Sequence, residues 1–151
     1  MKKLISVILC FMLCLGMGNK AMAVENEECI DGSYLTNDDS SEVTVGAVSR
    51  GIYLKSGTSI INKQGTGKIG AGGDTVGQKI VSKITVVVQV ERLENGRWYT
   101  YGSSWSATNY NSAYVSTSKV KTVATGYYYR VRCTHYANSD VSTSCTNGIY
   151  I

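Results

Sequence analysis

From Gly46 onward, apolar and polar residues alternate along the chain with a period of two, which is typical of half-buried β-strands. The clearest segment is KIVSKITVVVQVERL at 79–93. One face of this strand carries Ile80, Ser82, Ile84, Val86, Val88 and Val90. Asn95-Gly96 then supplies a two-residue hairpin turn, because both residues tolerate a positive φ. No segment has the 3.6-residue stripe of an amphipathic helix.

Other alternating segments predict further strands, with turn residues between them. They lie at 50–55, 58–62, 97–105, 113–123, 126–135 and 142–151, and the glycine-rich residues 65–77 read as a flexible connection. Seven to eight short strands at this spacing indicate an all-β, antiparallel sandwich. A small barrel is the alternative.

The first 23 residues have a different pattern. Lys2 and Lys3 precede an apolar run from Leu4 to Met17, and Ala21-Met22-Ala23 follows, which is the layout of a cleaved secretory signal peptide. The run is shorter than the roughly 18–20 residues of a membrane span, so we expect no stable membrane anchor. The sequence therefore predicts a signal peptide at 1–23 and a bacterial protein that is secreted into the extracellular space.

Charge divides the remaining chain into two parts. Residues 24–45 contain seven acids and no lysine or arginine, whereas residues 46–151 contain twelve lysines and arginines against four acids. We interpret 24–45 as a flexible acidic arm and 46–151 as the folded β-sandwich domain. The arm is either a solvated leader, or a mask over a basic face or removable pro-segment.

The segment GYYYRVRCTH at 126–135 holds the only histidine of the chain. On a strand, Tyr127, Tyr129, Val131, Cys133 and His135 share one face, which we assign to the core. A following antiparallel strand can bring Cys145 to Cys133, and export favours a disulfide between them. Cys29 is then the odd cysteine, able to link two chains into a dimer, bind a small thiol, or displace one partner of that pair.

The stretch TGYYYRVRCTH resembles the sixth strand of immunoglobulin-like and fibronectin type III-like domains, in which a corner tyrosine begins a similar alternation. Trp98, just after the hairpin turn, lies where such domains place a core tryptophan. Residues 79–135 are also similar to small secreted Gram-positive proteins of mostly unknown function. The resemblance implies an immunoglobulin-like β-sandwich, without the inter-sheet disulfide of antibody domains, because 79–93 contains no cysteine.

The sequence favours no enzyme. Cys133 and His135 lack a recognisable oxyanion loop, and at positions i and i+2 they are poorly spaced for a direct hydrogen bond. The letters G-x-G-x-x-G at 65–70 have no helix after them, so no cofactor is expected. One histidine and three cysteines beyond the signal peptide fit no zinc spacing, so no metal site is expected either.

Aromatic residues gather in the predicted hairpin and its following loop, among serines, threonines and asparagines. The predicted ligand surface comprises Trp105, Tyr110, Tyr128, Arg130 and Arg132. Aromatic rings with neighbouring hydroxyls stack on sugars, and a basic domain attracts anionic wall polymers. We therefore expect a binding module for a cell-wall polymer, glycan or surface protein, with no nucleic-acid partner. The alternatives are an assembly subunit of a surface or matrix and a secreted effector whose arm is removed.

Overall fold

The computed structural model describes residues 28–46 and 51–151. In these ranges all the regular secondary structure is β-strand. The strands are β1 (Cys29–Ile30), β2 (Ser33–Thr36), β3 (Ser40–Gly46), β4 (Leu54–Lys63), β5 (Lys68–Glu94), β6 (Arg97–Thr100), β7 (Trp105–Thr122), β8 (Tyr128–Ala137), β9 (Asp140–Cys145) and β10 (Gly148–Tyr150). The predicted signal peptide lies outside the described residues. In the described ranges, no helix is long and apolar enough to cross a membrane.

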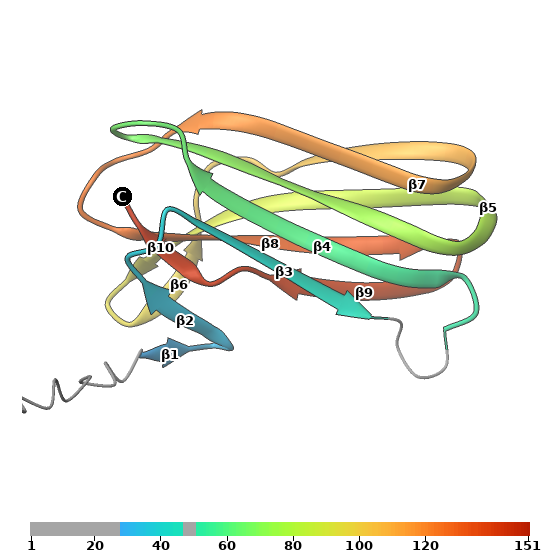
Figure 1. The fold of residues 1–151 in the computed structure, drawn as a ribbon, viewed down its shortest axis with the longest axis horizontal. Coiled ribbons are helices and arrows are strands. Elements are labelled where there is room, and N and C mark those ends of the chain that lie inside the picture. The colour runs from blue at the N-terminus through green and yellow to red at the C-terminus, as the bar shows by residue number, and fades with distance from the viewer. Residues whose placement is uncertain (1–27, 47–50) are drawn as a thin grey trace, which may run out of the picture.

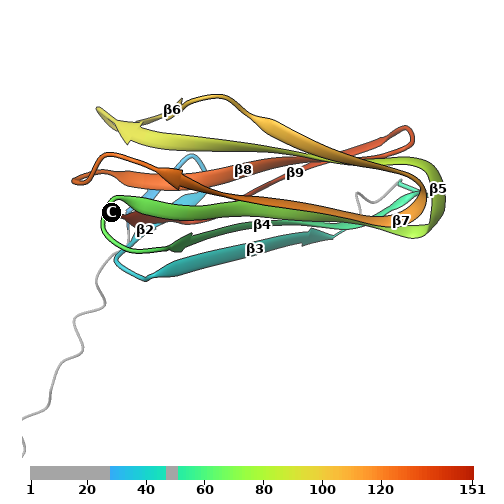
Figure 2. The same ribbon diagram turned by 90° about the horizontal axis from the view of Figure 1, so that it is seen from above.

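One continuous sheet contains the strands, in the order β1-β2-β10-β8-β5-β4-β3, with β6 and β7 also paired to β5 and β9 to β8 (Figure 1). Strands β5 and β7 are long enough to belong to two layers. Residues 69–77 of β5 pair with β4, and 68–76 pair with 114–122 of β7. Further along β5, residues 84–92 pair with β8, and 81–88 pair with 105–112 of β7. The sheet therefore folds over between 76 and 81, as Figure 2 shows at its right-hand end.

The all-β class is confirmed. The sheet is mixed, because β2 and β10 run parallel while the other pairs are antiparallel, and it curls into a half-barrel. Its layers are parts of one folded sheet, so the immunoglobulin-like sandwich is not confirmed. The predicted hairpin is present, with positive φ angles of 50° at Asn95 and 74° at Gly96.

The glycine-rich segment is part of a strand, so its assignment as a flexible connection is wrong for 68–77. Its glycines allow neighbouring groups to approach the backbone. A Cβ at Gly73 would lie 2.5 Å from Cys133 Sγ in the opposite layer and from Thr58 O. Glycine therefore occupies these positions because the strands pack too closely for a side chain.

The acidic segment is folded as well, which makes the flexible-arm prediction wrong for residues 28–45. Strand β3 pairs with β4 along its whole length and alternates exposed and partly buried positions. Strand β2 pairs with β10, and the buried Ser33 hydroxyl donates to Thr146 O at 2.7 Å. The short alternation in SSEVTVG is a strand signal that the high acid content obscured.

The core lies between the two layers. It is built from alternate residues of β5 and β8, together with residues of β4 and β7, and includes Leu54, Ile61, Ile69, Ile84, Val86, Val88, Val90, Val115, Tyr129, Val131 and Cys133. The predicted inward face of β8 is confirmed from Tyr129 to His135. Tyr127 precedes the strand and is exposed, which corrects its assignment to the core.

Candidate functional site

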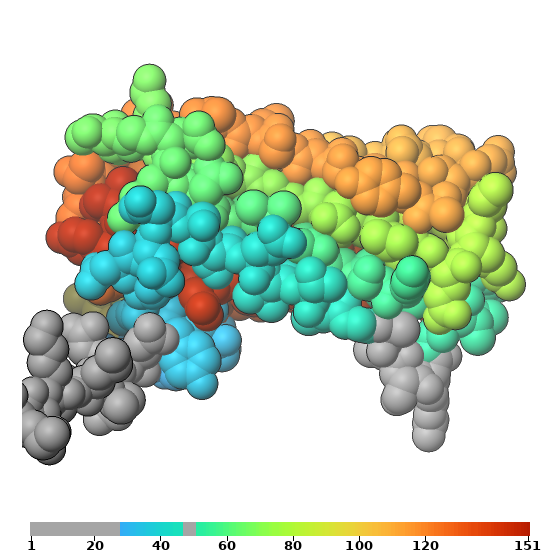
Figure 3. All heavy atoms as spheres, in the orientation of Figure 1, coloured from blue at the N-terminus to red at the C-terminus, as the bar shows by residue number. Residues whose placement is uncertain are grey.

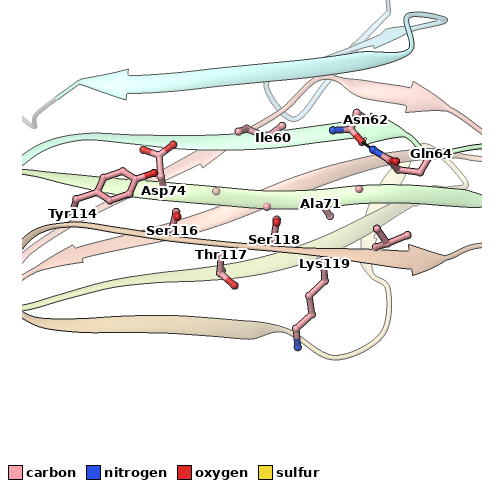
Figure 4. Close-up of a pocket in the computed structure, with 14 residues that line it drawn as sticks. Ile60, Asn62, Gln64, Ala71, Asp74, Tyr114, Ser116, Thr117, Ser118 and Lys119 are labelled. Carbon is pink, nitrogen blue, oxygen red and sulfur yellow. Dashed lines mark hydrogen bonds between the residues drawn. The ribbon is translucent and has the colours of Figure 1, made fainter.

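A groove of about 720 Å³ crosses the outer face of the first layer, over β4, β5 and β7 (Figure 4). Its central strand, β5, contributes Gly70, Gly72 and Asp74 at alternate positions. Because two of these three positions have no side chain, the outer face is hollowed along β5. Ile60 and Asn62 from β4 and Ser116, Ser118 and Val120 from β7 line the groove on either side.

The register of the strands explains this arrangement. Gly72 lies opposite Ile60 on one side and Ser118 on the other. A Cβ at Gly72 would come within 2.7 Å of Thr117 O and 2.8 Å of Ser118 Cβ, so the neighbouring strand requires a glycine at this position. The floor of the groove is therefore set by close packing of the backbones of β5 and β7.

Polar groups of three kinds line the groove. The carboxylate of Asp74 accepts, the hydroxyls of Ser116 and Ser118 both donate and accept, and the amide of Asn62 does the same. The Asn62 amide oxygen also accepts from Gln64 Nε2 at 2.5 Å. Burial raises the pKa of Asp74 above its ordinary value, against a hydrogen bond from Thr58 that lowers it.

Tyr114 closes one end of the groove beside Asp74 (Figure 4). Its side chain is 51% exposed, so its ring is available to a ligand. Figure 4 shows Lys119 extending from β7 on the side away from Asn62 and Asp74. The charge of Glu42 also raises the pKa of Asp74. The groove thus combines one accessible aromatic ring with hydroxyl, amide and carboxylate groups, and its own charge is negative.

The predicted ligand surface is not assembled. Trp105 is only 9% exposed and Arg130 is fully buried, so neither can belong to an exposed surface. Tyr128 is partly buried and packs edge-on against Tyr150, with ring centroids 5.1 Å apart. Tyr110 is 68% exposed but pairs with Lys83, far along the sheet from Arg132, which pairs with Gln89.

Trp105 is buried because it faces inward between the layers, where Lys119 and Lys121 cover its ring at 5.5 and 5.0 Å. Its indole Nε1 is the one buried side-chain nitrogen or oxygen without a hydrogen-bond partner among the described residues. The sequence did not predict this packing, because Trp105 and the two lysines lie in separate predicted strands, 97–105 and 113–123.

Arg130 is buried because the β1–β2 hairpin covers it. Its guanidinium donates to Glu91 Oε2 and Asp31 Oδ2, both at 2.7 Å, and also to Asp31 O and Ser33 Oγ at 2.9 Å. The Trp98 ring lies 4.6 Å from the guanidinium carbon. Hydrogen bonds from Arg130 hold the pKa of Asp31 below its ordinary value. Asp31 also pairs with Arg132, so the acidic segment does cover basic residues, as the masking hypothesis predicts.

The predicted disulfide is absent. Cys133 lies opposite Ser144, and Cys145 lies opposite Arg132, so the two cysteine side chains point to opposite faces of the sheet. All three described cysteines are free thiols, and Cys29 is exposed. Burial raises the pKa of Cys133 to about 11, which keeps it in the unreactive thiol form.

His135 is a core residue, in agreement with its place on the predicted inward face of the strand. Its Nδ1 lies 2.9 Å from Thr75 Oγ1 and its Nε2 lies 2.8 Å from Ser144 Oγ, which is in turn hydrogen-bonded to Ser59. Burial lowers the pKa of His135 to about 4, so the ring is neutral at physiological pH. This network is closed to solvent.

A model of a family of unknown function, DUF6147, matches residues 23–150. The chain belongs to this family. The comparison with curated proteins found no match, and neither did the comparison with solved structures. In the described ranges of this DUF6147 member, no group of three or more histidine, cysteine, aspartate or glutamate residues could hold a metal ion.

Sequence reasoning missed the groove of this DUF6147 protein. The signal was present in GAGGD at 70–74, where glycine, alanine and aspartate fit a strand with a bare outer face. Its flanking residues Ser116 and Ser118 belong to a predicted strand, but nothing local showed that this strand would lie beside Gly72.

Proposed function

We propose that the protein is a secreted, non-enzymatic binding module and that the groove between β4, β5 and β7 binds a glycan. The observation that carries this proposal is the glycine floor between hydroxyl, amide and carboxylate groups, with an exposed tyrosine at one end. A sugar ring presents hydroxyls at its edge and C–H groups on its face, so it suits a site with both polar groups and an aromatic ring.

Secretion is supported by the signal-peptide layout of residues 1–23. The absence of catalysis is supported by the burial of Cys133 and His135, since neither can reach a substrate. The effector alternative loses support, because removal of the acidic segment would break the pairing of β3 with β4 and of β2 with β10.

The charge of the groove favours neutral glycans over acidic ones. Asp74 lies in the groove and Glu42 is close enough to affect its pKa, so a polyanion would be repelled there. A glycan without acidic groups meets no such cost, and its hydroxyls can donate to the Asp74 carboxylate. We therefore expect neutral sugars, where the sequence alone suggested anionic wall polymers.

The test is affinity electrophoresis of the purified protein in gels that contain soluble neutral polysaccharides, followed by calorimetric titration with any that retard it. Tyr114→Ala removes the aromatic ring, and Asp74→Asn removes the charge while preserving shape. Each should weaken binding by about 5- to 100-fold, as expected for loss of a stacking or charged contact of about 1–3 kcal/mol.

Tyr110→Ala is the matched control, because Tyr110 lies on the same strand and is more exposed but does not line the groove. Its affinity should equal that of the wild type. Equal losses in Tyr110→Ala and Tyr114→Ala would contradict the groove as the site. Retention only by acidic polymers, declining with salt, would instead assign binding to the basic surfaces.

A further inference from the structure

The end of the molecule at which β5 turns from one layer to the other exposes aliphatic side chains, at the right in Figures 1 and 3. Ile80 is 71% exposed and Ile52 is 60% exposed. Ile80 is the most exposed large hydrophobic residue in the ranges 28–46 and 51–151. Single exposed apolar residues need no explanation, but a group of them at one end indicates a contact surface.

Several contacts place these residues together. The backbone N–H of Gln78 donates to Tyr53 O at 2.8 Å, and the Lys79 ammonium lies 5.2 Å from the Tyr53 ring centroid. Ile52 precedes Tyr53 at a bend of the chain, and Ile80 follows Lys79 where the pairing of β5 is interrupted between 76 and 81. Tyr110 lies opposite Lys83 a short way along the same pair of strands.

This end also carries free positive charge. Lys55, Lys79 and Lys83 are exposed, and none has an ion-pair partner in the part of the chain that the structure describes. Asp140 reaches the same end, but its carboxylate accepts the backbone N–H groups of Tyr53 and Leu54 at 2.7 and 3.0 Å. These hydrogen bonds lower the pKa of Asp140 and occupy one of its oxygens.

We propose that this end, defined by Ile52, Ile80, Lys79, Lys83 and Tyr110, docks on the surface of an anionic lipid bilayer. The two isoleucines enter the boundary between headgroups and acyl chains, and the lysines contact lipid phosphates. Tyr110 suits the same depth, because its ring is apolar and its hydroxyl remains in water. This site is separate from the groove and does not depend on glycan binding.

The combination of features favours a lipid surface over a protein partner. The exposed aliphatic residues are two isoleucines at one end of the molecule, whereas a stable protein interface buries about 800 Å² on each side and is usually broader. The lysines have no ion-pair partner among the described residues, and the flexible stem of a lysine suits a diffuse layer of negative charge. A second copy of the chain would place like charges in contact and is disfavoured for that reason.

The test is co-sedimentation of the protein with vesicles of phosphatidylcholine containing phosphatidylglycerol, and with vesicles of phosphatidylcholine alone. Binding is expected for the anionic vesicles and should decline with salt. The double variant I52S/I80S should lower the partition coefficient by about tenfold or more. The variant K79Q/K83Q should lower it several-fold and weaken its salt dependence.

The control variant Y34S/Y99S removes two other exposed side chains, each 49% exposed, away from this end and outside the groove. It should bind like the wild type. Unchanged binding of I52S/I80S, or no binding of the wild type to anionic vesicles, overturns the proposal. A concentration-dependent dimer that I52S/I80S abolishes, without vesicle binding, would assign the surface to a second copy and also overturn it. Since both isoleucines are exposed, thermal unfolding of the variant should match the wild type.

Discussion

Replacement of Gly57 by alanine should destabilise the protein through a single side chain in the opposite layer. The new Cβ would lie 2.6 Å from His135 Nδ1 and closer still to two carbon atoms of the ring. The ring is fully buried and held from both sides by Thr75 and Ser144, so it cannot withdraw without breaking those hydrogen bonds. The added methyl group and the histidine therefore compete for one space.

Opposing free energies decide the sign of the effect. Alanine restricts the unfolded chain and by itself stabilises by about 0.4–1 kcal/mol. Overpacking costs about 1–3 kcal/mol, and each lost hydrogen bond costs about 0.5–1.5 kcal/mol. We expect G57A to lower the free energy of unfolding by about 2–4 kcal/mol, measured by urea denaturation with tryptophan fluorescence.

A double-mutant cycle isolates the cause. His135→Ala removes the ring, so G57A should cost little in that background, and the coupling energy should be close to the whole cost of G57A, about 2–4 kcal/mol. Gly46→Ala is the matched control, because Gly46 is also a strand residue and its Cβ would meet no atom within 4 Å. The reasoning is refuted if G57A is as stable as G46A, or if G57A and H135A are additive.

Three further predictions follow from the buried groups. Because burial lowers the pKa of His135 to about 4 from an ordinary 6.5, its contribution to the free energy of unfolding is complete above pH 6.5 and is lost as pH falls toward 4. In urea titrations this loss of stability should reach about 3 kcal/mol, and it should disappear in H135A. In the native protein, Cys29 should react rapidly with a thiol reagent and Cys133 only after unfolding. Mass spectrometry should find no bond between Cys133 and Cys145; a native mass lower by two hydrogen atoms, with those cysteines linked, would disprove the register. Arg130→Met should lower the free energy of unfolding by about 3–5 kcal/mol, because Glu91 and Asp31 lose their buried partner. Amide hydrogen exchange should rise first at 29–36, and a uniform rise would show that Arg130 does not hold the β1–β2 hairpin.

The period-two alternation of the sequence determined the strand class and the Asn95-Gly96 hairpin. It also determined the inward face of β8 from Tyr129 to His135. These properties are local, because successive side chains on a strand point to opposite faces wherever the strand lies. The same rule applied to SSEVTVG would have placed β3, had the acidic composition not been taken as the stronger signal.

Tertiary structure decided which side chains meet. The register of β8 with β9 places Ser144 opposite Cys133, and a shift of one residue would have placed Cys145 there. Arg130 lies on the outer face of β8, as its position in the alternation requires, but a hairpin 99 residues earlier covers it. The groove needs Gly72 beside Ser118, a neighbour fixed only when β5 and β7 pair. Sequence therefore sets the direction of each side chain, whereas long-range pairing sets its neighbours, because that pairing depends on the packing of the whole core.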